Sequence, residues 1–183
     1  MLKRCSWCSL SNPVYIEYHD TEWGVLNLDD KYLFEMLILE SFHAGLSWEI
    51  VLNKRENFRK AFDDFDINKI INYNSKKIDE ILNDSGIIRN KLKINATISN
   101  AKIFKDIQAE CGSFSGYLTS WTKSKIYFEI GNVRSELSDN ISKDLIKRGM
   151  KFVGSVIIYA YLQAIGIINS HDKDCYLYKN TKS

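Results

Sequence analysis

The stretch Leu39-Glu40-Ser41-Phe42-His43-Ala44-Gly45-Leu46-Ser47-Trp48 decides the fold of this chain. It closes one apolar helix, turns, and opens a second helix. Asp29 and Asp30 are natural N-caps for the first helix, because a side-chain carboxylate can accept from the free backbone N–H groups there. Ser47 can cap the second helix in the same way, and we expect that helix to run from Trp48 to about Phe62.

Glu40 is expected to be a buried carboxylate. The first helix is apolar nearly all the way round, with a polar stripe of Lys31 and Glu35, and at about 100° per residue Glu40 falls on the opposite side. A carboxylate there must be paired, hydrogen-bonded or kept for a ligand. A structural ion pair is one interpretation. The aromatic residues nearby in sequence favour the other, a site for a flat, electron-poor or cationic ring; they are Tyr15, Tyr18, Trp23 and Trp48.

Gly45 permits the turn between the two helices, because glycine adopts backbone conformations that other residues avoid. Leu46 follows it and can either stand exposed at the tip of the turn or pack into the core. Its spacing alone favours the core.

Length and composition predict one mostly helical domain. The 183 residues are 45% hydrophobic, which is enough for a real core. One proline and nine glycines leave few breaks, and apolar residues recur mostly at helical spacing, so the expected class is all-α. We expect a single domain over residues 1–183, with a helical core at about 29–166 and terminal segments at about 1–24 and 167–183. The net charge of +2 permits a nucleic-acid partner without requiring one.

The N-terminus lacks the apolar run of a signal peptide, and no stretch is long and apolar enough to span a membrane. We therefore expect a cytoplasmic protein, where structural disulfides are rare. The four cysteines then point to metal binding, catalysis or ordinary burial. Cys111 is expected to pack as a small hydrophobe.

Further helices are expected along the rest of the chain. After the acidic turn at 63–66, short helices should start at Ile67 and Ser75, a long one should run from about residue 87 to Glu110, and a short one should cover 113–121. The long helix carries cations off its apolar stripe, and these are either solvated or in contact with phosphate; they are Arg89, Lys91, Lys93, Lys102 and Lys105. Residues 123–140 are the least regular, a surface excursion with a possible strand at 125–130.

A glycine-flanked turn is expected between two later helices, at about 138–148 and 155–165. Gly149 should end the first helix and Gly154 should open the second. Glycines let a backbone approach a phosphate closely, and the N–H groups at a helix start bind it. A plain turn between two helices would have the same pattern.

His171 and Cys175 form a good half-site for zinc, because residues at i and i+4 face the same way on a helical turn. A closed structural site takes four nitrogen or sulfur ligands. Unless His43 contributes, the other two come from Cys5, Cys8 and His19. Spacing favours the C-x-x-C pair Cys5 and Cys8, while Cys5 with His19 is equally possible sterically. Either choice joins the two ends of the chain; the alternative is reduced cysteines with no metal.

Many short segments, in order along nearly the whole chain, resemble the 3-methyladenine DNA glycosylase I family. The matching segments are Arg4-Cys5-Ser6-Trp7, Tyr15 to Gly24, Leu33-Phe34-Glu35-Met36, Leu39-Glu40, Ala44 to Trp48, Leu52 with Lys54 to Asn57, Gly86 to Asn90, Lys147-Arg148-Gly149, Lys151 to Gly154, and His171 with Cys175.

The resemblance implies a helix-hairpin-helix glycosylase fold in which a structural zinc ion joins the N- and C-terminal segments. It implies that Glu40 is the catalytic carboxylate, which hydrogen-bonds the flipped base. The implied zinc ligands are Cys5, His19, His171 and Cys175. The implied base-binding residues are Tyr18, Trp48, Trp23, Tyr15 and Trp7. The implied DNA contacts are Gly45, Leu46, Gly149, Lys151 and Gly154.

The activity implied by the resemblance is a DNA repair glycosylase that flips out and hydrolytically excises 3-methyladenine from double-stranded DNA. It would release the free base and leave an abasic site. A monomer is the default expectation for the oligomeric state. N3-methylation makes adenine cationic and weakens its glycosidic bond. A site that binds this cation therefore needs to make only a modest further catalytic contribution. No lysine falls in the expected pocket, so no lyase step is expected. The segment 155–168 holds no acidic residue, although related helix-hairpin-helix glycosylases carry an aspartate there.

The chain departs from the family pattern at three places. Lys91 stands where many relatives have arginine, Cys8 is an additional cysteine, and residues 123–140 match poorly, so no role is carried over to them. A second hypothesis is a zinc-stabilised DNA-binding module that recognises damaged DNA without catalysis, although a mere binder needs no buried acid such as Glu40. A third, a metallohydrolase, needs an open metal position, and four protein ligands leave none.

Overall fold

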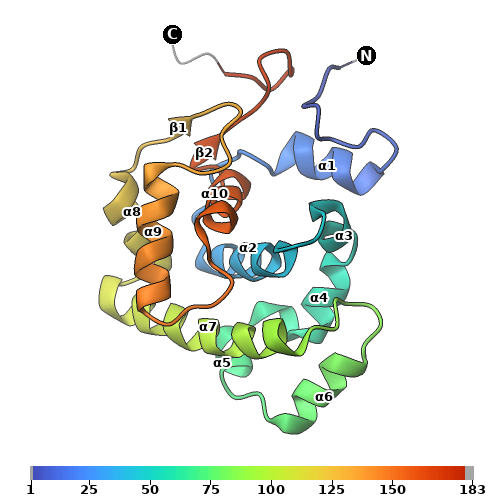
Figure 1. Cartoon of the computed structure of the whole chain (residues 1–183), viewed down its shortest axis with the longest axis vertical. Helices are drawn as coiled ribbons and strands as arrows, with labels where there is room; N and C mark the ends of the chain where they lie inside the picture. Colours follow the sequence, from blue (N-terminus) through green and yellow to red (C-terminus); the bar gives the residue numbers. More distant parts are fainter. Residues whose placement is uncertain (1, 180–183) are drawn as a thin grey trace.

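The chain folds into a mostly helical structure, as expected from its sequence (Figure 1). The computed structural model describes residues 2–179. Ten α-helices, one 3-10 helix and two short strands are found in this range: α1 Pro13–Thr21, α2 Asp30–His43, α3 Trp48–Asn53, α4 Arg55–Ala61, η1 Asp63–Phe65, α5 Ile67–Ile70, α6 Ser75–Asn83, α7 Lys91–Cys111, α8 Phe114–Thr122, β1 Tyr127–Phe128, α9 Glu136–Lys147, α10 Ser155–Ala164 and β2 Ile168–Asn169.

Helix α2 runs through the middle of the molecule, and α10, α7, α3 and α8 pack against it (Figure 1). Every residue from Leu33 to Phe42 is buried. The expected polar stripe is therefore wrong at Glu35, which is only 6% exposed. Two arginines of α4 reach this side of α2 and pair with the carboxylate: Arg55 Nε lies 2.6 Å and Arg59 Nε 2.9 Å from Glu35 Oε1.

The two helices of the central stretch begin where their caps predict. Asp29 accepts from the Tyr32 backbone N–H at 3.0 Å, and Ser47 accepts from that of Ile50 at 3.4 Å. The second helix is shorter than expected, because the segment to Phe62 is split into α3 and α4 at Lys54, whose φ and ψ are −101° and 1°.

Other expected elements are confirmed with shifted ends. Helix α7 begins at Lys91, because the Asn90 side chain caps it by accepting from the Lys93 backbone N–H at 3.1 Å. Cys111 is exposed and does not pack as a small hydrophobe, since it is the last residue of α7, before the Gly112 C-cap. Helix α1 was not expected from the sequence. It begins with Pro13 and is capped by Asn12.

The predicted pair of helices around a glycine-flanked turn is present as α9, residues 148–154 and α10. Gly149 has a φ of +101°, which favours glycine, and Gly154 is the N-cap residue of α10. The two helices pack directly against each other. Residues 148–154 therefore form a compact turn at one end of the pair, which we call the α9–α10 turn.

The N-terminal and C-terminal segments of the described chain lie next to each other. The Tyr176 N–H donates to the Lys3 carbonyl at 2.8 Å. Strand β1 pairs in parallel with β2, Tyr127 with Ile168 and Phe128 with Asn169, so the expected strand at 125–130 is present but only two residues long. This pairing brings the irregular segment 123–140 beside the C-terminal segment. No helix within residues 2–179 is long and apolar enough to cross a membrane.

Candidate active site and metal cluster

A cavity of about 290 Å³ opens beside the last turn of α2. All six residues that the sequence analysis places around a base line this cavity: Trp7, Tyr15, Tyr18, Trp23, Glu40 and Trp48. Tyr15 and Tyr18 come from α1, and Trp48 opens α3. The N-terminal segment, the end of α2 and the start of α3 therefore converge on one site.

The aromatic side chains hold one another in place through edge-to-face and tilted contacts. The ring of Trp7 lies 5.3 Å from that of Tyr15 and 4.8 Å from that of Trp23, in both cases edge to face. The rings of Tyr18 and Trp48 are 5.6 Å apart, with an angle of 50° between their planes. Aromatic faces and edges thus line the cavity, which suits a flat ring and especially a cationic one.

Glu40 is buried, as expected, with 3% of its surface exposed. Its Oε2 lies 2.9 Å from His43 Nδ1, and among residues 2–179 no lysine or arginine forms a salt bridge with it. Burial raises the pKa of Glu40, while the hydrogen bond from His43 opposes that rise. A structural ion pair with a permanent cation therefore does not account for this carboxylate.

His43 also lines the cavity. From the sequence alone, His43 is expected only as an alternative metal ligand. It lies one helical turn after Glu40, and its ring packs edge to face on Trp48 at 5.6 Å. The i, i+3 spacing on α2 was the signal that could have placed it beside the carboxylate. The hydrogen bond from the imidazole orients the carboxylate.

The indole N–H of Trp48 is buried and has no hydrogen-bond partner among the described residues. A buried donor without a partner costs free energy, and most buried polar groups in proteins are paired. Because an indole N–H can only donate, only a group with an acceptor atom could satisfy it.

Six further residues line the cavity that no sequence pattern predicts. They are Gly131 and Asn132, Ala160 and Gln163 of α10, and Ser170 and Asp172. The loop residues reach the cavity because β1 pairs with β2, which also places the Glu129 N–H 3.1 Å from the Asn169 carbonyl. A pairing of two residues between distant segments leaves no pattern in the sequence.

The four candidate metal ligands, Cys5, His19, His171 and Cys175, are all buried, and their ligand atoms lie within 4.8 Å of one another. Cys5 Sγ is 3.4 Å from His171 Nδ1, and Cys175 Sγ is 3.5 Å from His19 Nε2. A tetrahedral zinc ion with Zn–S bonds of about 2.3 Å and Zn–N bonds of about 2.0–2.1 Å separates sulfur and nitrogen ligands by about 3.5 Å. The donor set and its spacing therefore fit zinc.

The cluster contains His19 and not Cys8, although spacing alone favoured Cys8. The Cys8 thiol is buried elsewhere, 3.8 Å from the Tyr15 carbonyl. His19 Nδ1 lies 2.8 Å from Asp20 Oδ1, which directs Nε2 to the cluster. Arg4 binds Asp20 through two hydrogen bonds of 2.8 and 2.6 Å and holds the pKa of that carboxyl well below its usual range.

The candidate DNA-contacting residues lie on two turns. Gly45 has a φ of +82° and no atom near the position of an added Cβ. Leu46 is 38% exposed, so the core packing that its spacing favoured is wrong, because the turn carries it past the end of α2. On the α9–α10 turn, Lys151 is exposed and Gly154 precedes the first N–H groups of α10.

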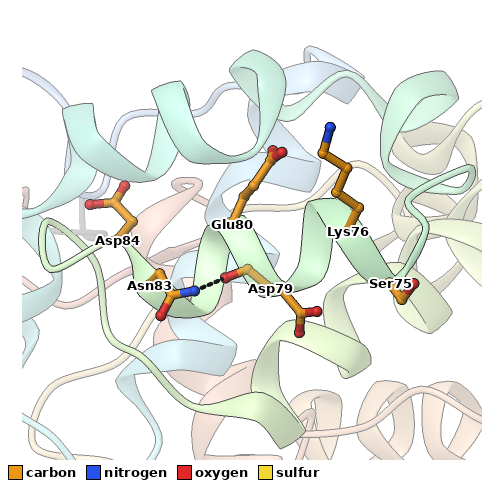
Figure 2. Close-up of a pocket in the computed structure, with 6 residues that line it drawn as sticks. All are labelled: Ser75, Lys76, Asp79, Glu80, Asn83 and Asp84. Carbon is orange, nitrogen blue, oxygen red and sulfur yellow. Dashed lines mark hydrogen bonds between the residues drawn. The ribbon is translucent and has the colours of Figure 1, made fainter.

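A larger hollow of about 670 Å³ lies along α6 (Figure 2). It is lined by residues of that helix and its C-cap: Ser75, Lys76, Asp79, Glu80, Asn83 and Asp84. These side chains are mostly exposed, and the hydrogen bond drawn among them runs from Asn83 Nδ2 to the Asp79 carbonyl at 2.9 Å. It has no aromatic wall and no buried acid, so the cavity beside α2 is the better candidate for an active site.

Comparisons with known proteins identify close relatives. The sequence model of the family described as methyladenine glycosylase matches residues 7–178. DNA-3-methyladenine glycosylase 1 of Escherichia coli (strain K12) is 40% identical over 187 residues, which span 99% of this chain and 100% of that protein. The DNA-3-methyladenine glycosylase of Haemophilus influenzae is 40% identical over 182 residues, 96% of this chain and 97% of that protein.

Solved structures of 3-methyladenine DNA glycosylase I are similar over the full length. A crystal structure of this enzyme matches with a TM-score of 0.92 and 39% identity, covering 97% of this chain and 100% of that one. The enzyme from Staphylococcus aureus, studied for its recognition of 3-methyladenine, matches with a TM-score of 0.91 and 33% identity, covering 98% and 99%.

Proposed function

This chain belongs to the methyladenine glycosylase family and is a DNA repair enzyme that excises 3-methyladenine, and we propose that Glu40 and the aromatic side chains around it bind the extruded base. The observation that carries this assignment is a buried carboxylate without a permanent counter-charge at the wall of an aromatic cavity. The alternative of a DNA-binding module without catalysis does not apply, because the relatives are glycosylases.

Base binding in this cavity explains the preference for a methylated base. Adenine in a duplex is neutral, whereas its N3-methylated form carries a positive charge. The Glu40 carboxylate attracts that charge, and the surrounding aromatic rings, of which Tyr18 and Trp48 are one contacting pair, add cation–π attraction. A neutral base gains neither the full attraction to the Glu40 carboxylate nor the cation–π attraction to the rings.

Excision then requires little further catalysis from the protein. The base must leave the duplex stack to reach a cavity of this size. The bond between the sugar and the methylated base breaks with its electron pair going to the base, which neutralises the base, and water adds to the sugar carbon while losing a proton. Because methylation has already weakened the bond, holding the extruded nucleotide in place is the main contribution of the protein. No lysine lines the cavity, which fits a monofunctional glycosylase without a lyase step.

We propose that Cys5, His19, His171 and Cys175 hold a structural zinc ion. All four positions are protein ligands, so such an ion would supply charge and geometry to hold the fold. His19 follows Tyr18 of the cavity directly, and His171 lies between Ser170 and Asp172. Joining the two terminal segments at this point fixes the N-terminal and C-terminal walls of the cavity relative to each other.

We propose that the molecule contacts duplex DNA through its two turns, as a single-domain monomer of the helix-hairpin-helix type. Leu46 at the tip of the α2–α3 turn enters the gap left by the extruded nucleotide, and Gly45 lets the backbone come close. The α9–α10 turn, with Gly149, Lys151 and the N-terminus of α10 after Gly154, binds a phosphate nearby.

Chromatography of the bases released from N-methylated duplex DNA tests this function. We expect free 3-methyladenine in the soluble fraction and an abasic site in the DNA, with no strand cleavage at neutral pH. Strand cleavage with a trapped covalent intermediate would contradict the monofunctional mechanism. Absence of any released base, with a folded protein that binds the duplex, would contradict the proposed role of the cavity.

A further inference from the structure

Two buried polar side chains on helix α7 take no part in the chemistry proposed above. Lys93 is 7% exposed, and Asn100 is completely buried. They are seven residues apart, which is two turns of an α-helix, so they leave α7 from the same face. Their positions along the helix axis differ by about 10 Å. Each of them holds the backbone of one of the two turns proposed to contact DNA.

Lys93 holds the end of α2 and the turn that follows it. Its ammonium group donates to the carbonyl oxygens of Phe42 and Ala44, at 2.8 and 2.6 Å. The carbonyls in the last turn of a helix have no partner within the helix, and a cation is favourable at that end. These contacts fix the backbone immediately before Gly45 and Leu46.

Asn100 holds the α9–α10 turn by both ends of its side-chain amide. Its Nδ2 donates to the Lys151 carbonyl at 2.9 Å, and its Oδ1 accepts from the Lys151 N–H at 2.9 Å. The ammonium group of Lys93 also lies 5.7 Å from the ring centre of Phe152 in the same turn. The α9–α10 turn is thereby attached to the same helix as the α2–α3 turn.

We propose that α7 is a rigid spacer that sets the separation of the two DNA-contacting turns, with Lys93 and Asn100 as its positioning residues. This rests on the proposed function, in which Leu46 fills the gap in the duplex while the α9–α10 turn binds a phosphate. The distance between a gap and a phosphate is fixed by the DNA, so both contacts form together only if the protein matches it. A displacement of about 1 Å at such a site can cost a factor of about 100.

A direct phosphate contact is the competing role for Lys93, and the geometry disfavours it. The ammonium group is buried and already donates to two carbonyls. A lysine that neutralises a phosphate releases counterions, so its loss lowers the salt dependence of DNA binding by about one in the log–log slope. Loss of a spacer contact leaves that slope unchanged.

The experiment separates the two turns from the base cavity by using two probes. A duplex with a stable abasic analogue requires the turns and not the cavity, whereas free 3-methyladenine requires the cavity alone. We expect Lys93→Met and Asn100→Ala each to weaken binding of the abasic duplex by about tenfold, with free-base affinity and the salt slope unchanged. Glu40→Gln should do the reverse. Adding Leu46→Ala should remove most of the Lys93→Met effect, because the turn then has no side chain to place.

Two control variants match the changes made by Lys93→Met and Asn100→Ala. Lys76→Met removes one positive charge from the exposed face of α6 (Figure 2), and Ile107→Val loosens the core on α7 two turns beyond Asn100. Neither should change the affinity for either probe. If Lys93→Met does not fold, Asn100→Ala carries the test alone.

The spacer role would be overturned if Lys93→Met and Asn100→Ala weakened the binding of both probes equally. It would also be overturned if Ile107→Val weakened binding of the abasic duplex by the same factor, because general instability would then explain the losses. A fall of one in the salt slope for Lys93→Met would assign that lysine to a phosphate. A wild-type protein that binds neither probe would instead contradict the proposed function itself, which keeps the two failures distinguishable.

Discussion

Removal of one ligand of the proposed zinc site should destabilise the protein strongly, and Cys175→Ala is the clearest perturbation. Cys5 and Cys175 are about 170 positions apart, so an ion that joins them closes almost the entire chain into a loop. The chain-entropy relation for a cross-link across a loop of this length gives about 5 kcal/mol at 25 °C. That figure is an upper value for a metal clip, since protons compete with zinc for the thiolates.

The predicted change is large enough to measure by thermal unfolding. For a chain of this size, 1 kcal/mol corresponds to about 2–4 °C in Tm, so a loss approaching 5 kcal/mol lowers Tm by about 10–20 °C. Zinc content by elemental analysis should fall from one ion per chain to none. A strong chelator added to the wild type should reproduce the lower Tm, and added zinc should reverse it.

Two other cysteines provide matched controls. Cys111→Ala removes an exposed thiol and should change neither zinc content nor Tm, while Cys8→Ala removes a buried thiol outside the cluster and should leave zinc content at one. A Cys175→Ala protein that retained one zinc ion and the wild-type Tm would contradict the proposed zinc site. Loss of zinc in Cys8→Ala would show that the ligand set is wrong.

Three further predictions concern single side chains. Burial raises the pKa of Glu40, so ionisation of this carboxyl opposes folding at any pH above its pKa in the unfolded chain. Glu40→Gln should therefore be more stable than the wild type at neutral pH, and this difference should vanish as the pH falls. Chemical unfolding curves recorded across pH measure it. Leu46→Ala should slow excision from duplex DNA by about tenfold in single-turnover kinetics while free-base affinity stays the same, whereas the exposed Ile50→Ala should affect neither. Arg55→Met removes the cation that Glu22 and Glu35 share and leaves Glu35 with Arg59 alone, so it should cost about 2 kcal/mol in urea unfolding. Arg134→Met at an exposed pair should cost about 0.5 kcal/mol or less.

The elements that the sequence predicts well are those specified by local contacts. Asp29 and Ser47 cap the helices that they were expected to cap, and Glu40 is buried because it lies on the apolar side of α2. The helical spacing that buries Glu40 does not reveal what covers the opposite side. Glu35 was therefore placed on a polar stripe, although the arginines of α4 enclose it.

The features that the sequence did not reveal depend on contacts between distant segments. Lys93 looks like the other lysines of α7, and only its position under the end of α2 makes it a buried donor. Asn132 reaches the cavity through a two-residue strand pairing that has no local pattern. Spacing likewise favoured Cys8 as a zinc ligand, while the fold brings His19 to the cluster because α1 turns its ring away from solvent.

We propose that an anionic Glu40 in an aromatic cavity holds the cationic base for excision. The most direct test is the single-turnover rate of 3-methyladenine release from a methylated duplex, compared between the wild type and Glu40→Gln at a pH where the wild-type carboxylate is ionised. We expect a rate at least about tenfold lower for Glu40→Gln, with unchanged affinity for a duplex that contains a stable abasic analogue. An equal rate in the two proteins would contradict the claim, because the charge on Glu40 would then play no part in excision.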